Sequence, residues 1–96
     1  MKEGISTLGV AERQRRLDRS ARLGYVTGTV ESFNGALSGT KYSYEYVSAG
    51  KPMATVIYYL QTTKRTIYRI EFTGSPKMLL DLADQTASIA RSFRLK

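Results

Sequence analysis

The chain of 96 residues contains no cysteine, no histidine and no tryptophan, and only two prolines. Without cysteine it has no disulfide, no thiolate nucleophile and no cysteine-based zinc site, and its redox compartment is left undetermined. Without histidine it lacks the imidazole base and the commonest metal ligand. We therefore expect no enzymatic activity, no metal site and no cofactor. A small enzyme that uses lysine or carboxylates stays open as a third hypothesis.

Motifs for nucleophilic catalysis and phosphate binding are missing as well. No serine lies in a Gly-x-Ser-x-Gly elbow, and Gly35 and Gly39 lack the Lys and Thr that complete a phosphate-binding loop. Asp81 and Asp84 are three residues apart on one predicted helix face. We interpret this pair as a solvated surface, and a cation site is the alternative.

Long apolar runs do not occur. The longest stretches, such as residues 54–60, fall far below the roughly 20 residues needed to cross a bilayer. Residues 1–24 carry too many charges to form the apolar core of a signal peptide. We expect no membrane span, and we expect export only if the chain is a piece of a longer protein in which Met1 is not the natural start.

With 42% hydrophobic and 24% charged residues, the composition is that of one globular domain. Its first part, residues 1–24, is predicted to be a basic N-terminal helix or linker. Leu8, Ala11, Leu17 and Ala21 share a broad face of a helix over residues 6–23. Gly9 disfavours the first turns, so the helix is expected to begin as late as residue 10, and Gly24 is expected to end it.

The second part, residues 25–96, has the period-two alternation of β-strands. Strands are predicted over residues 25–33, 40–47, 53–62 and 66–73, separated by a loop at 34–39 and by turns at 49–52 and 62–65. Val26, Gly28 and Val30 are expected on one face of the first strand. The strand over residues 53–62 is apolar on both faces, so we place it in the centre of the sheet. Its second face is covered either within the monomer or by a second copy.

Ser75 and Pro76 form a strong helix start, with a capping side chain followed by proline at the first position. The helix that follows carries an apolar stripe of Met78, Leu79, Leu82, Ala83, Thr86, Ile89, Ala90 and Phe93. We expect this stripe to cover the sheet face that presents Tyr68, Ile70 and Phe72. The predicted fold class is α+β: an antiparallel meander of about four strands, with an N-terminal helix and a C-terminal helix packed on one face.

Basic charge is the first feature that points to a partner. Residues 1–24 contribute about half of the net charge of +7, with five arginines at Arg13, Arg15, Arg16, Arg19 and Arg22. They suit binding to nucleic acid or to an anionic surface. The plainer interpretation is a solvated helix or linker, because no aromatic residues that would stack on bases are interleaved with these arginines. Nucleic acid is therefore the less favoured partner.

Tyrosine is the second such feature. Tyr42, Tyr44 and Tyr46 share one face of a predicted strand. They suit an aromatic surface that binds a protein or peptide. Tyrosine suits a half-buried sheet position equally well, where its ring packs and its hydroxyl stays hydrated.

Several short elements of the second part resemble those of small PsbP-like domains. They are the Gly50-Lys51-Pro52 turn, the Thr66-Ile67-Tyr68-Arg69-Ile70 strand, the Ser-Pro helix start and the closing Ile-Ala-Arg-Ser-Phe-Arg. Together with Asn34-Gly35-Ala36 they are also similar to the accessory domain that follows the catalytic domain of some bacterial HExxH zinc metallopeptidases. The resemblance covers roughly residues 24–95. It implies an α+β fold and a non-catalytic role in binding or positioning, and it transfers no catalytic residue, since the chain has no histidine.

The sequence therefore predicts a non-enzymatic accessory domain from a longer bacterial protein, which binds a protein or peptide, including its own parent catalytic domain, near Tyr42, Tyr44 and Tyr46. If the metallopeptidase resemblance holds, the domain is extracytoplasmic or membrane-associated, and otherwise it is cytoplasmic. The alternative is a free-standing basic module that binds nucleic acid or an anionic surface through the five arginines. Neither the identity of the partner nor the oligomeric state follows from the sequence.

Overall fold

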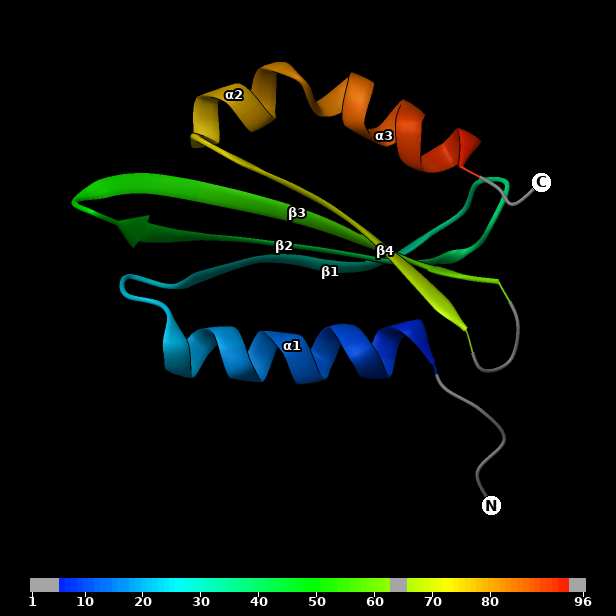
Figure 1. The fold of residues 1–96 in the computed structure, drawn as a ribbon, viewed down its shortest axis with the longest axis horizontal. Helices are drawn as coiled ribbons and strands as arrows, with labels where there is room; N and C mark the ends of the chain where they lie inside the picture. Colours follow the sequence, from blue (N-terminus) through cyan, green and yellow to red (C-terminus); the bar gives the residue numbers. More distant parts are fainter. Residues whose placement is uncertain (1–5, 63–65, 94–96) are drawn as a thin grey trace.

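The computed structural model describes residues 6–62 and 66–93. Helix α1 is followed by four strands and two short helices, with bounds α1 Thr7–Ala21, β1 Val26–Phe33, β2 Gly39–Ser48, β3 Lys51–Gln61, β4 Ile67–Gly74, α2 Pro76–Asp81 and α3 Ala83–Ser92. The strands form one antiparallel sheet in the order β1-β2-β3-β4. Helix α1 packs on one face of this sheet, and α2 and α3 lie over the other, rather than on one shared face (Figure 1). The predicted α+β fold with a four-stranded meander is confirmed. The predicted turn at 62–65 lies mostly outside the described residues, as does Arg94 of the closing motif.

Helix α1 begins at Thr7, earlier than residue 10. The side chain of Ser6 caps it by accepting a hydrogen bond from the Gly9 backbone N–H at 2.9 Å, which satisfies a donor that the first turn leaves free. The helix ends at Ala21, earlier than the predicted stop at Gly24, because the backbone is already extended at Arg22. Gly24 lies in the turn that follows and has a φ of +66°, a left-handed conformation that favours glycine.

Strand β3 lies between β2 and β4, as its two apolar faces predicted. Its residues Ile57 and Tyr59 pack on the α1 side of the sheet, and Tyr58 and Leu60 pack on the opposite side. Both faces are therefore covered within one chain. The turn before β3 is shorter than predicted, because the strand already begins at Lys51. Within the predicted turn, Ala49 and Gly50 have positive φ, as a two-residue hairpin turn requires.

Strand β1 contains an irregularity that the alternation in the sequence did not reveal. The register with β2 shifts between Thr27 and Val30, next to Gly28. A Cβ atom on Gly28 would lie 2.6 Å from the Ser43 Oγ, so glycine allows the two strands to approach here. Because of the shift, Val26 pairs with Glu45 and Val30 pairs with Tyr42, two residues on opposite faces of β2. The expectation that Val26, Gly28 and Val30 share a face was wrong.

The C-terminal helix is divided in two at Leu82, where φ is −101° and ψ is 13°. Ser75 caps α2 as predicted, and its side chain accepts a hydrogen bond from the Met78 N–H at 3.1 Å. The predicted cover over β4 is confirmed: Ala90 is buried in a cluster with Tyr58 and Leu60, and Ile70, Phe72 and Phe93 pack against it. The continuous stripe is not formed, because the break changes the helical phase and leaves Met78, Leu82 and Ile89 exposed.

Candidate functional site

The three predicted binding tyrosines lie beneath α1. Tyr42 and Tyr44 are 0% and 2% exposed, and Tyr46 is half-buried at the edge of the same cluster. Ala11 of α1 is buried against them, so the helix occupies the face that a partner would need. Tyr42 and Tyr44 thus have no free ring face in this structure, and for them the packing interpretation applies.

A buried polar network holds α1 to these tyrosines. Asp18, only 3% exposed, accepts hydrogen bonds from the Tyr42 hydroxyl at 3.0 Å, Gln14 Nε2 at 3.2 Å and Arg22 Nε at 3.1 Å. Because the Tyr42 hydrogen goes to Asp18, the Tyr25 hydroxyl donates to Tyr42 over 2.8 Å. Burial raises the pKa of Tyr42 far above its ordinary value, and the hydrogen bonds to Tyr25 and Asp18 act in the same direction. Tyr42 is therefore a neutral donor that orients the helix.

The five predicted arginines separate into two groups. Arg22 forms an ion pair with Asp18 and lies over the rings of Tyr44 and Tyr46, at 5.3 and 4.7 Å from their centroids. Arg15 is paired with Glu12 at 2.6 Å. The remaining three, Arg13, Arg16 and Arg19, are exposed, and their guanidinium groups have no hydrogen bond or ion pair to any described residue. Only these three present free positive charge.

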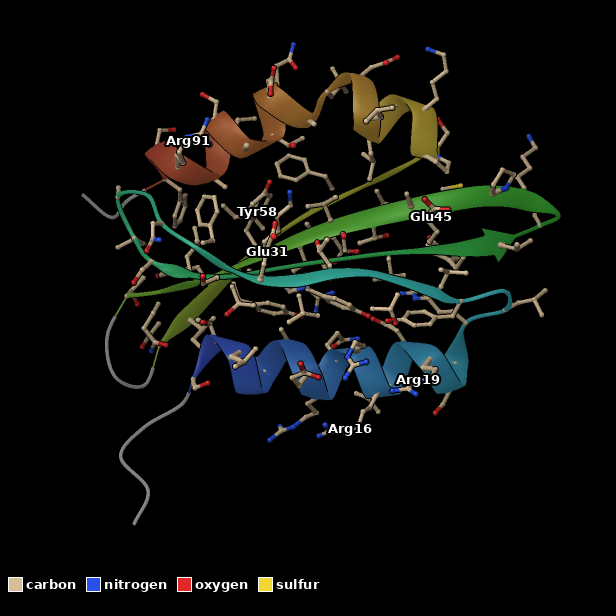
Figure 2. All side chains as sticks on the ribbon, turned by 180° about the vertical axis from the view of Figure 1, so that it is seen from behind. Arg16, Arg19, Glu31, Glu45, Tyr58 and Arg91 are labelled. Atoms are coloured by element: carbon tan, nitrogen blue, oxygen red, sulfur yellow. The ribbon has the colours of Figure 1, made fainter. Side chains whose placement is uncertain are left out.

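A hollow lies on the opposite face of the sheet, between α2 and strands β1 to β3. It is an open groove of about 470 Å³. Small residues, Gly28, Ser43 and Ala54, line it on the sheet side, and Leu79 and Leu80 line it on the α2 side. Glu45 and Lys77 are the charged residues that line it, and Figure 2 shows Glu45 on the α2 side of the sheet.

The sequence did not predict this groove. Ser43 and Glu45, which line it, alternate with the tyrosines on β2. The small residues that line it come from separate strands, and the register between the strands brings them together. The alternation of large tyrosines with small or polar residues was the available signal, but it gave no indication of which face a helix would cover.

Among residues 6–62 and 66–93, no group of three acidic side chains is placed so that it could hold a metal ion. Asp81 is paired with Lys77 at 2.9 Å on the surface of α2. Among the helices described, none is long and apolar enough to cross a membrane.

Comparisons with family models, with curated proteins and with solved structures find no match to this chain. The resemblance to PsbP-like domains and to the accessory domain of zinc metallopeptidases therefore stays a prediction.

Proposed function

We propose that this chain is a non-enzymatic binding domain that holds an apolar segment of a protein or peptide partner in the groove beside α2. The observation that carries the proposal is the groove itself. Its volume of about 470 Å³ falls within the range of about 300–1,000 Å³ typical of ligand sites. Its lining is mainly apolar, with few polar groups, as such sites require.

The exposure of α2 supports the same surface. Leu80 lines the groove and is 75% exposed, and Met78 on the same helix is half exposed. An exposed apolar side chain at the rim of a hollow, such as that of Leu80, is typical of interaction sites. A partner that covers Leu80 removes apolar surface from water, which favours association.

Charge favours a particular kind of segment. Glu45 lines the groove and has no ion pair with any residue in the described part of the chain. Lys77 is already neutralised by Asp81. A peptide that places a large apolar side chain in the groove and a lysine or arginine near Glu45 has the matching chemistry. Because the resemblance implies an accessory domain, such a segment in a parent catalytic domain is one source of the partner.

The test is selection of binders from a displayed peptide library, followed by titration of the selected peptides against two variants. Ala83→Trp fills the groove, and Ala21→Trp makes the same change on α1 at the other side of the sheet. We expect peptides that combine apolar and basic residues, with binding lost in the first variant and kept in the second. Equal binding to both variants overturns the groove as the site. Hydrolysis of the peptides by the chain alone overturns the non-enzymatic assignment.

A further inference from the structure

Free positive charge gathers on the outside of α1. Arg13, Arg16 and Arg19 follow one another at intervals of three residues, all exposed. The acidic residues of this helix, Glu12 and Asp18, are each already paired with another arginine. The helix therefore presents three positive charges that nothing in the described part of the chain neutralises. Figure 2 shows Arg16 and Arg19 on α1, and Arg16 points away from the sheet.

The position of α1 makes these charges available to a flat surface. The helix is the outermost element on its side of the sheet (Figure 1). With 15 residues it is about 22 Å long and straight enough to lie along a plane. A planar surface that approaches this helix reaches all three arginines at once.

Exposed leucines accompany the charges. Leu17, one turn after Arg13, is 58% exposed, and Leu23, in the turn after α1, is 76% exposed. A phosphate backbone would leave these side chains in water, whereas a lipid headgroup layer accepts cations and apolar side chains together. The tyrosines nearest to α1, which could stack on nucleobases, are buried or half-buried beneath it.

We infer that the outer surface of α1 binds an anionic lipid bilayer, with Arg13, Arg16 and Arg19 at the headgroup phosphates and Leu17 and Leu23 in the interfacial layer. This inference is independent of the groove, which lies on the opposite face of the sheet. Each arginine near an anionic bilayer contributes about a fivefold gain in partitioning, so the three together give roughly a hundredfold.

The test is sedimentation of the protein with vesicles of phosphatidylcholine, with and without phosphatidylserine, at low and high salt. We expect binding only to the vesicles that contain phosphatidylserine. This binding should be lost at about 0.5 M salt, because salt of that concentration screens the attraction between the arginines and the headgroups. The variant Arg13→Gln/Arg16→Gln/Arg19→Gln should lower partitioning by roughly a hundredfold. Equal binding by this variant overturns the inference.

A matched control removes the same charge elsewhere. Lys51→Gln/Lys77→Gln/Arg91→Gln lowers the net charge by the same three units, in the β2–β3 turn region and on α2 and α3, although Lys77 is paired with Asp81. We expect it to change partitioning far less than the α1 variant, and an equal loss would show an effect of net charge alone. Leu17→Gln should weaken vesicle binding.

A DNA duplex of random sequence serves as the competing probe. Tight binding to this duplex without binding to the vesicles overturns the lipid assignment in favour of nucleic acid. Unchanged far-ultraviolet circular dichroism and thermal midpoint in every variant exclude loss of fold as the cause.

Discussion

Asp18 gives the sharpest test of how α1 is held to the sheet. Replacing it with alanine removes the charged acceptor of the buried Tyr42 hydroxyl, which keeps only its hydrogen bond to the Tyr25 hydroxyl. A hydrogen bond to a charged group contributes about 1.5–3 kcal/mol. The ion pair with Arg22 adds less than about 1 kcal/mol, because the Arg22 side chain is 34% exposed and water screens the interaction. We expect Asp18→Ala to lower the free energy of unfolding by about 3 kcal/mol.

The chain offers a matched control in α2. Asp81 also pairs with a basic residue four positions away, Lys77, at 2.9 Å, but both side chains are largely exposed. Asp81→Ala should change the free energy of unfolding by less than about 0.5 kcal/mol. Urea unfolding followed by circular dichroism measures both values. For a domain of this size, the difference between the variants is a fall in the thermal midpoint of roughly 12–20 °C.

A double-mutant cycle isolates the hydrogen bond itself. Tyr42→Phe removes the donor, and the cycle with Asp18→Ala should give a coupling energy of about 1 kcal/mol or more, since the two groups are in direct contact. Coupling below about 0.3 kcal/mol, or equal losses for Asp18→Ala and Asp81→Ala, would refute the view that this buried network anchors α1.

Burial raises the pKa of Tyr42, Tyr44 and Tyr59, so the unfolded chain loses these protons at a lower pH than the folded chain. The free energy of unfolding is therefore unaffected by these groups below about pH 10. Above that pH it falls by about 1.4 kcal/mol per pH unit for each such tyrosine. Tyr42→Phe should make this alkaline slope shallower by one such increment in urea titrations; an unchanged slope would contradict the burial argument. Gly35→Ala should destabilise the domain by about 1–3 kcal/mol, because the added Cβ would lie 2.8 Å from the Arg91 Cα and disturb the adjacent Ala36 N–H bond to the Arg91 carbonyl. Gly50→Asn, at a positive φ with open space around it, should cost less than about 1 kcal/mol, and a larger loss than at Gly35 would count against this contact.

The sheet was predictable from the sequence because its signals are local. The alternation around Tyr42 and Tyr44 fixes a strand, and the two apolar faces around Ile57 and Tyr58 fix a central one. The capping pair of Ser75 and Pro76 likewise marks the start of α2 through interactions within a few residues.

The remaining features depend on tertiary packing. Of the apolar face predicted for the first helix, Ala11 is buried but Leu8 and Leu17 are exposed. Asp18, which was not part of that face, is buried because Tyr42 and Arg22 satisfy it. The helix break at Leu82 could not be predicted, because no glycine or proline occurs near this residue in the sequence. The α1 helix covers the tyrosine face, and α2 lies over the face with Ser43 and Ala54, an assignment that alternation alone cannot make.

The attachment of α1 has a consequence for the order in which the protein opens. Only Ala11 and Asp18 of this helix are buried, whereas β3 buries a long run of residues on both faces. A layer that buries so few of its residues can separate in a local opening of lower free energy than global unfolding. Amide hydrogens of α1 should then exchange with deuterium well before those of β3. Each such opening would briefly uncover a row of tyrosine rings along β2.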